Sequence, residues 1–375
     1  MRVSSWRLSR GLVAVDERPV FGGSPRVGRG QVILRAETGV LVADRSFSVR
    51  AVLRRMLEAK TGVKVIGEAE DGREAARLAA ELRPDAVVLD LDLPSLGGRD
   101  LVEAISVHRR VPIFVVTPKQ RGDATRVAFS VHNLGVVAVF PKPESSGEWE
   151  ELGRVLGEAV DQIGATATPG VGDLVDPEDT PVVSRHIDYV AVGASTGGPG
   201  AIFEMLRGLG RRSRVGVAVV QHIAEGFESD LADWLASELG MDVAVARNGE
   251  DLAAGRVRVA PPGSHLTLDH QGTLKLDRGV GPVNGHRPAV DNLFRSLLDH
   301  RPRRVAAVLL SGMGSDGAEG MAELRRANVL TIAQERSSCA VFGMPRAAIE
   351  RGAAAFALAP TQIGRLLARA GGAKQ

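Results

Sequence analysis

Several things are scarce in this sequence of 375 residues, and each scarcity excludes a class of protein. There is one cysteine, Cys339, so an internal disulfide framework and a multi-cysteine metal site are both excluded, and a reducing, cytoplasmic setting fits. Aromatic residues make up only 4% of the chain and the formal net charge is only +2, so we expect no nucleic-acid partner. Apolar runs such as Val305–Leu310 are as long as a strand and far shorter than the roughly 20 residues of a membrane span, so we expect no direct membrane insertion.

The N-terminal residues 1–38 show no regular pattern. They are rich in glycine and carry seven arginines against three acidic residues. No apolar segment is followed by a small-residue cleavage site, so a secretory signal is not indicated. We predict a disordered extension or a start codon assigned too early.

The rest of the chain alternates short apolar runs with amphipathic stretches, and it does so in two blocks. The first block occupies residues 39–145, with a last helix that reaches about residue 163, and the second occupies residues 188–370. Residues 164–187 between them hold several prolines, glycines and acidic residues and predict a linker. The fold class expected is therefore α/β, with two doubly wound parallel-sheet domains joined by a linker.

In the first block, polar residues follow the apolar runs at the carboxyl ends of the predicted strands. They are Asp44, Asp90, Thr117 and Lys142. Loops at these ends form the binding crevice of an open parallel sheet. Carboxylates with a lysine and a hydroxyl suit Mg²⁺-assisted phosphoryl transfer, although a single strand-terminal Asp is equally typical of a helix cap.

Residues 40–143 resemble a response-regulator receiver domain, which has a flavodoxin-like fold. The stretch Val-Leu-Asp-Leu-Asp-Leu-Pro at residues 88–94 resembles the phosphoacceptor loop of that family. The resemblance implies that Asp90 is the phosphoacceptor, that Thr117 is the switch hydroxyl, and that Lys142 is the active-site lysine. It further implies a histidine kinase as phosphodonor and Mg²⁺ at Asp44 and Asp90.

The chain departs from the receiver pattern at two positions. The family has two adjacent acidic residues after its first strand, whereas here Asp44 is followed by Arg45. Arg45 brings a positive charge to the place where Mg²⁺ should bind, which counts against the metal. The switch aromatic position is occupied by Val139.

In the second block, Ser195 stands on a glycine-rich turn between an apolar run and a helical stretch. The sequence there is Gly-Ala-Ser-Thr-Gly-Gly-Pro, a Gly-x-Ser-x-Gly pattern. Such a turn exposes a serine nucleophile, and the backbone N–H groups that follow it can stabilise an oxyanion. A phosphate-binding turn is the alternative, but the Gly-Lys-Ser/Thr sequence of a P-loop is missing.

A serine nucleophile needs a base and an orienting acid. Among eight histidines, His222 follows the apolar run at residues 217–221 and should reach the same crevice as Ser195. Asp316 follows a glycine-rich turn and is a candidate acid, although it could also be a helix cap. The other candidate acid is Asp291, which we expect to be a surface cap. His265 and His286 stand in loops that could line a substrate groove, and four more histidines are predicted to be solvated: His108, His132, His270 and His300.

Residues 188–360 resemble the chemotaxis protein-glutamate methylesterases, which have a Rossmann-like catalytic domain. The motifs that carry the resemblance are Gly-Ala-Ser195-Thr-Gly-Gly-Pro, Val-Gln-His222-Ile, Ala-Pro-Pro-Gly-Ser-His265-Leu-Thr-Leu, Pro-Val-Asn-Gly-His286-Arg287-Pro, Ser-Gly-Met313-Gly-Ser-Asp316-Gly and Gly-Met-Pro-Arg346-Ala. The order of receiver, linker and esterase matches that family as well.

The resemblance implies a serine carboxyl-ester hydrolase with the triad Ser195, His222 and Asp316. It places Thr196 and the backbone near Met313 at the oxyanion, and it places His265, His286 and Arg287 in the substrate region. No cofactor is expected for the esterase. The implied substrates are glutamate γ-methyl esters on methyl-accepting chemoreceptors, with deamidation of receptor glutamines as a related activity and phosphorylation of the receiver as the control. The alternative is a non-catalytic or phosphorylation-independent signalling adaptor with a degenerate receiver, which Arg45 favours and the intact triad does not.

Overall fold

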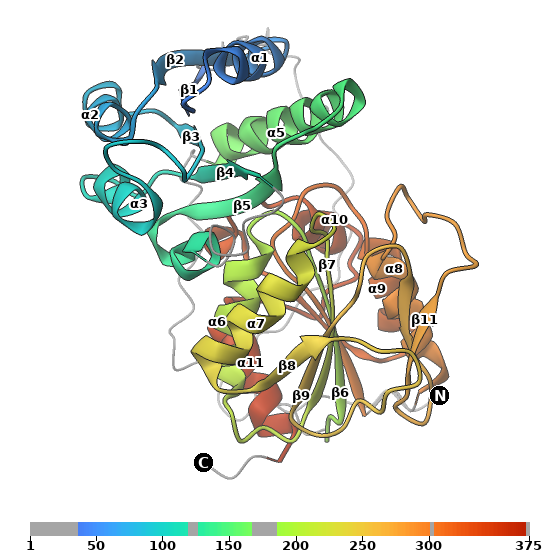
Figure 1. Cartoon of the computed structure of the whole chain (residues 1–375). Coiled ribbons are helices and arrows are strands. Elements are labelled where there is room, and N and C mark those ends of the chain that lie inside the picture. The colour runs from blue at the N-terminus through green and yellow to red at the C-terminus, as the bar shows by residue number, and fades with distance from the viewer. Residues whose placement is uncertain (1–36, 119–126, 167–185, 301–303, 373–375) are drawn as a thin grey trace, which may run out of the picture. The chain divides into compact units, whose positions relative to one another are not determined.

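The structure is a computed structural model that describes residues 37–118, 127–166, 186–300 and 304–372 (Figure 1). The predicted extension at residues 1–38 and the predicted linker at residues 164–187 lie almost wholly outside the described residues. Each of the two predicted α/β blocks contains its own parallel sheet.

The first sheet has five strands in the order β2-β1-β3-β4-β5, all parallel. Its β3 is buried along its whole length, as expected for a parallel strand covered on both faces. The sequence forms its helices with local caps: the Asp71 carboxylate, for example, accepts the N–H groups of Arg73 and Glu74, both at 2.9 Å, at the start of α2. The strands are β1 (Thr38–Ala43), β2 (Val63–Ala69), β3 (Ala86–Leu89), β4 (Ile113–Thr117) and β5 (Val136–Pro141), and the helices are α1 (Phe47–Glu58), α2 (Gly72–Leu82), α3 (Gly98–Ser106), η1 (His132–Leu134) and α5 (Ser146–Thr166).

The second sheet has seven parallel strands in the order β14-β13-β12-β6-β7-β9-β8. These strands are β6 (Tyr189–Ala194), β7 (Gly216–Gln221), β8 (Asp242–Val245), β9 (Arg256–Val259), β12 (Val305–Leu309), β13 (Leu330–Gln334) and β14 (Phe356–Leu358). Its central strands β6, β7 and β12 are almost entirely buried. Burial on both faces explains why the sequence shows nearly continuous apolar runs there and not an alternating pattern.

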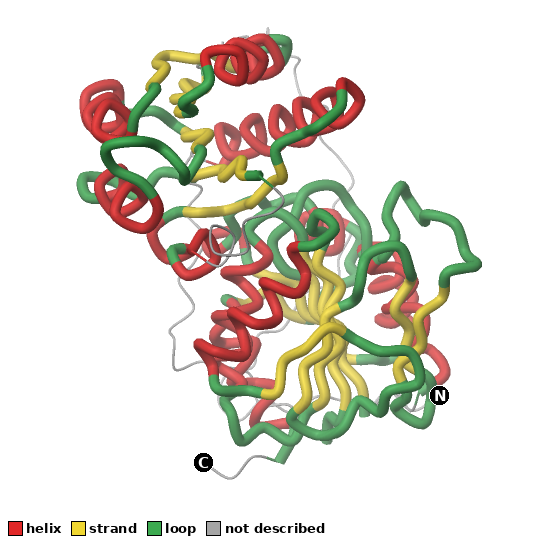
Figure 2. Tube along the Cα trace, in the orientation of Figure 1, coloured by secondary structure: helices red, strands yellow, loops and turns green. Residues whose placement is uncertain are grey.

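Helices cover both faces of this seven-stranded sheet (Figure 2). One face packs on α6 (Gly198–Leu209), α7 (Phe227–Leu239) and α11 (Pro360–Ala370). The other face packs on α8 (Val290–Ser296), α9 (Ala318–Arg326) and α10 (Met344–Glu350), together with η2 (Leu297–Asp299). The short helix η3 (Arg336–Ser338) follows β13. The two-layer cover confirms the predicted doubly wound architecture.

Two further features complete the second block. Residues 265–277 contain an antiparallel hairpin of β10 (His265–Leu268) and β11 (Leu274–Asp277), outside the seven-stranded sheet. After β13 the chain continues with α10, β14 and α11. One expectation is corrected here. His300, predicted to be solvated, is only 8% exposed, and its Nε2 donates to the Leu268 carbonyl at 3.2 Å.

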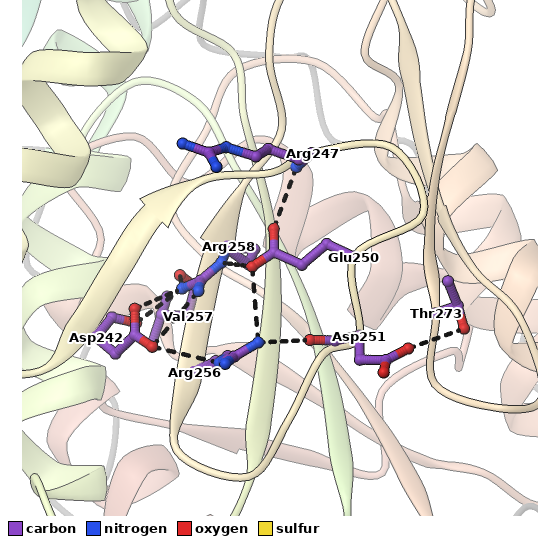
Figure 3. A network of polar contacts seen from close by, with 8 residues as sticks. All are labelled: Asp242, Arg247, Glu250, Asp251, Arg256, Val257, Arg258 and Thr273. Carbon is purple, nitrogen blue, oxygen red and sulfur yellow. Dashed lines mark hydrogen bonds and ion pairs between the residues drawn. The ribbon is translucent and has the colours of Figure 1, made fainter.

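A polar network ties together the β8–β9 edge of the second sheet (Figure 3). The buried guanidinium of Arg258 donates from Nε to Glu250 Oε1 at 2.6 Å and from Nη1 to Asp242 Oδ1 at 2.9 Å. Arg256 Nε lies 3.4 Å from the other oxygen of Asp242, Oδ2. A buried cation is tolerated only when it is paired and hydrogen-bonded, and both conditions hold here. The network therefore explains how a charged side chain is accommodated in β9. No helix of the described residues is long and apolar enough to cross a membrane.

Candidate active site

Ser195 stands immediately after β6, on the turn that opens α6. Its N–H donates to the Ser311 carbonyl at 3.0 Å, and its carbonyl accepts the N–H of Gly198 at 2.8 Å. Gly197, the residue before the helix, has a φ of +78°, which glycine adopts without strain. The backbone on both sides of the serine is therefore fixed, as the strand–turn–helix pattern predicted.

His222 follows β7, which pairs with β6 in parallel. Ala194 and Gln221 are partners in the register, so Ser195 and His222 are the next residues of two neighbouring strands. The His222 N–H donates to the Ala194 carbonyl at 2.9 Å. Adjacent strands lie about 4.8 Å apart, so the two side chains start from neighbouring points at the same edge of the sheet.

Asp316 comes from the turn after β12, the strand on the other side of β6. Its Oδ2 lies 3.0 Å from His222 Nε2 and accepts the Val290 N–H at 2.7 Å, while its Oδ1 accepts the Asp291 N–H at 3.0 Å. Burial raises the pKa of Asp316, but the hydrogen bond and charge of His222 and the two backbone donors outweigh burial, and the net pKa is lowered. Asp316 is therefore held as a carboxylate against the imidazole.

This contact assigns a role to each nitrogen of the His222 ring. Because a carboxylate only accepts hydrogen bonds, Nε2 must carry the proton that faces Asp316. In the neutral form of the ring, Nδ1 then carries no proton and is the nitrogen that can accept one from a hydroxyl. The arrangement is capable of general base chemistry on a serine.

Two backbone N–H groups near Ser195 are available to an oxyanion. The N–H of Ser195 itself is used by the Ser311 carbonyl, whereas among the described residues those of Thr196 and Met313 have no backbone partner. The turn that carries Met313 lies close to the serine: a Cβ on Gly312 would come within 2.8 Å of Ser195 Cβ. The glycine therefore permits this close approach.

The imidazole of His286 stacks on that of His222, with ring centroids 3.9 Å apart and planes 8° apart. Burial and the proximity of His222 lower the pKa of His286. His286 thus lies against the candidate base and favours its neutral form there. The adjoining Arg287 is exposed, and its carbonyl accepts the Gly263 N–H.

His265 does not line a groove, which corrects that expectation. It is fully buried in β10; its Nε2 donates to the Gly281 carbonyl at 2.9 Å and its Nδ1 accepts the Ala289 N–H at 3.2 Å. The ring is therefore hydrogen-bonded to both ends of the loop that carries His286, at Gly281 and at Ala289.

Asp291 is not a surface cap, which corrects a second expectation. It is 1% exposed; it accepts the Gly320 N–H at 2.7 Å and the Asn284 side-chain amide at 3.2 Å. Burial and the nearby Asp316 raise the pKa of Asp291. Asp291 therefore holds α8, α9 and the His286 loop together but does not contact His222 in the structure.

Gln221 is a site residue that sequence reasoning did not single out. Its buried side-chain amide donates to the Ser195 carbonyl at 2.8 Å and to the His222 carbonyl at 2.9 Å. One side chain thus connects the turns that carry the candidate nucleophile and base. A glutamine at the end of a buried strand was the only sequence signal for it.

In the first sheet, the predicted residues also come together. Lys142 Nζ lies 2.6 Å from Asp44 Oδ2 and 2.5 Å from Asp90 Oδ2. Burial lowers the pKa of Lys142, but the hydrogen bonds with both carboxylates outweigh burial and raise it overall. Thr117 is fully buried, and its hydroxyl has no hydrogen-bond partner among the described residues.

Comparison with known proteins covers both blocks of the chain. The CheB methylesterase family model matches residues 190–367, and the response regulator receiver domain model matches residues 40–152. A protein-glutamate methylesterase/protein-glutamine glutaminase of Anaeromyxobacter dehalogenans is 39% identical over 88% of this chain and 95% of its own length. A relative of the same name from Symbiobacterium thermophilum is 36% identical over 89% of this chain and 97% of its own.

Among solved structures, the Thermotoga maritima CheB methylesterase catalytic domain is 34% identical and matches with a TM-score of 0.47 over 49% of this chain and 98% of that chain. The family models and the full-length relatives agree with the motifs described above. The chain therefore belongs to the CheB methylesterase family, in the form that joins a response-regulator receiver domain to the methylesterase domain.

Proposed function

We propose that this protein hydrolyses the γ-methyl esters of glutamate residues on methyl-accepting chemoreceptors and deamidates receptor glutamines. Curated relatives that match nearly their whole length to this chain carry the name protein-glutamate methylesterase/protein-glutamine glutaminase. Both substrates are γ-carboxyl derivatives of the same side chain, so one acyl-enzyme serves both reactions. The proposal places the protein in the cytoplasm, with chemoreceptors as substrates and a histidine kinase as phosphodonor.

The chemistry proposed is nucleophilic catalysis through an acyl-enzyme. The Ser195 Oγ attacks the γ-carbonyl carbon while its proton passes to His222 Nδ1. Asp316 fixes the ring and stabilises the imidazolium, and the N–H groups of Thr196 and Met313 face the developing oxyanion. The C–O bond to methanol then breaks, methanol leaves with the proton from His222, and water hydrolyses the acyl-enzyme by the same steps.

This proposal rests on the positions of three residues that follow three neighbouring strands of the sheet. Ser195, His222 and Asp316 follow β6, β7 and β12, which are adjacent in the sheet. His222 Nε2 lies 3.0 Å from Asp316 Oδ2, and the buried Asp316 carboxylate also accepts two backbone N–H groups. This is the geometry that an orienting acid requires.

The test is methanol release from methylated receptor membranes. Ser195→Ala should lower kcat by about 10⁴–10⁶-fold, because the nucleophile is removed. Ser337→Ala, an exposed serine whose hydroxyl donates to Glu335, is the matched control and should leave kcat unchanged. Methanol release by Ser195→Ala at a rate close to that of the wild type would refute the assignment.

We further propose that phosphorylation of Asp90 controls the esterase. A phosphoryl site there is supported by Lys142 beside Asp90 and by the Thr117 hydroxyl, which has no hydrogen-bond partner among the described residues. A radiolabelled small phosphodonor should label the wild type but not Asp90→Asn, and it should change the rate of methanol release only in the wild type. Equal labelling of both proteins would remove Asp90 as the acceptor.

The alternative role, a signalling adaptor without catalysis or without phosphorylation, is favoured by one observation, the Arg45 that follows Asp44. Methanol release separates the two roles. A wild-type protein that releases no methanol from receptors in either the presence or the absence of phosphodonor would favour the adaptor.

A further inference from the structure

The two N–H groups available to an oxyanion belong to peptide units whose carbonyl oxygens are already hydrogen-bonded. The Thr196 N–H shares a peptide unit with the Ser195 carbonyl. The Met313 N–H shares one with the Gly312 carbonyl. Among the described residues the only cis peptide bond precedes a proline, so both units are trans, and in a planar trans unit the N–H and the C=O point in opposite directions. Hydrogen bonds that fix each carbonyl therefore also fix the direction of its N–H.

The two carbonyls are held in different ways. The Gly312 carbonyl accepts two backbone N–H groups at the start of α10, at 2.8 and 3.0 Å. The Ser195 carbonyl accepts one backbone donor, the Gly198 N–H at 2.8 Å, and one side-chain donor, Gln221 Nε2, also at 2.8 Å. Within the described part of the chain, Gln221 is the only side chain that donates to either carbonyl. It is therefore the side chain through which the direction of the Thr196 N–H depends on the sequence.

The amide of Gln221 has one orientation that fits its surroundings. Nε2 uses one proton for the Ser195 carbonyl and the other for the His222 carbonyl, at 2.9 Å. A flipped amide would place Oε1 against two carbonyl oxygens with no proton between them. Gly198 leaves room for Oε1, because a Cβ at that residue would collide with this atom. Since Gln221 is buried, solvent does not compete with its amide for the two carbonyls.

We infer, on the basis of the proposed esterase function, that Gln221 is a positioning residue of the oxyanion site, which acts through the Ser195–Thr196 peptide unit to hold the Thr196 N–H toward the substrate carbonyl oxygen. As the Ser195 Oγ bonds to the γ-carbonyl carbon, the π electrons of the C=O bond move to its oxygen, and the Thr196 and Met313 N–H groups stabilise that charge. A donor that is fixed before the reaction needs no reorganisation when the charge develops. The hydrogen bond from Nε2 also polarises the peptide unit and strengthens its N–H as a donor.

The first test separates kcat from KM in methanol release from methylated receptor membranes. Gln221→Met keeps a long side chain and removes both donors. We expect kcat to fall by about 10²-fold, as for the loss of one oxyanion donor, with KM unchanged, because the oxyanion exists only beyond the ground state. An unchanged kcat, or a loss that appears only as a higher KM, would overturn the inference.

Gln362→Met is the matched control for this test. Gln362 is a buried glutamine of α11 whose Oε1 accepts the Ala359 N–H at 3.0 Å. The preceding residue, Thr361, lies against Gly208 in the last turn of α6, whereas Ser195 stands before the first turn. Its replacement removes a buried amide far from the oxyanion site, so kcat and KM should both stay at the wild-type values.

The second test observes the Thr196 N–H without turnover. The serine Oγ adds to the boron of phenylboronic acid, and the tetrahedral adduct carries an oxygen at the oxyanion position. In full-length protein labelled with ¹⁵N-threonine and saturated with this acid, the Thr196 N–H resonance, assigned by its loss in Thr196→Ser, should move downfield in the wild type and in Gln362→Met but not in Gln221→Met. Equal downfield shifts in the wild type and Gln221→Met would overturn the inference.

The two tests also separate this inference from the proposed function. A wild type that neither releases methanol nor forms the boronic acid adduct contradicts the esterase function itself. A wild type that does both, beside a Gln221→Met variant with the same kcat and the same Thr196 shift, contradicts only the role of Gln221.

Discussion

Replacement of Asp316 by asparagine is the most discriminating perturbation of the proposed triad, because it keeps the shape and removes the charge. The carboxylate accepts three hydrogen bonds: from His222 and Val290 at Oδ2, and from Asp291 at Oδ1. Asparagine offers only one acceptor oxygen. Its NH₂ group therefore faces a backbone N–H in either orientation, that of Val290 at the Oδ2 position or that of Asp291 at the Oδ1 position.

Each orientation of the amide has a calculable consequence. With NH₂ at the Oδ2 position, His222 Nε2 becomes an acceptor, its proton moves to Nδ1, and the ring can no longer take the serine proton. With NH₂ at the Oδ1 position, it faces the Asp291 N–H and leaves that donor unsatisfied, at a cost of about 1–3 kcal/mol. The first orientation has the wrong tautomer, for which a loss of about 10⁴-fold in kcat is typical.

The assay is kcat for methanol release, with the thermal unfolding midpoint measured on the same samples. Asp291→Asn is the matched control, since Asp291 is an equally buried neighbouring carboxylate that does not contact His222. We expect it to keep kcat within about ten-fold of the wild type, because it acts only through the loop that it holds. If Asp291→Asn loses about 10⁴-fold and Asp316→Asn does not, the acid has been assigned to the wrong residue.

Two further predictions follow from contacts of the same site. Gln221→Leu removes the amide that donates to the Ser195 and His222 carbonyls. We expect kcat to fall by about 10²-fold with little change in KM, because a small displacement of a catalytic group costs that much. An unchanged kcat would show that the two turns keep their positions without this amide. The pKa of Asp316 is lowered in the folded protein, so its stabilisation is present above the unfolded pKa of about 3.9 and is lost as pH falls through the folded pKa. The difference in free energy of unfolding between wild type and Asp316→Asn should therefore shrink below about pH 4 in denaturant titrations, and a difference that stays constant down to pH 3 would contradict the cited cause.

The sequence predicted the second domain well where the pattern was long and uniform. The apolar runs of β6, β7 and β12 are buried on both faces, so hydrophobicity alone located them, and strand ends located Ser195, His222 and Asp316. It failed where burial depended on distant partners. His265 was predicted to line a groove, His300 to be solvated and Asp291 to be a surface cap. Each is buried instead, and each has a hydrogen bond with a segment at least 16 residues away.

By itself, the sequence determined the two parallel sheets, the candidate triad and the missing second acid at Arg45, because each depends on residue identity and local order. Only the tertiary structure decided which strands are neighbours, and hence that Asp316 and not Asp291 contacts His222. It also showed that Lys142 spans both carboxylates and leaves the Thr117 hydroxyl unpartnered among the described residues. The physical reason is that hydrogen-bond partners are set by strand order and turn geometry, and residues 94 positions apart, such as His222 and Asp316, carry no mark of their contact in the chain.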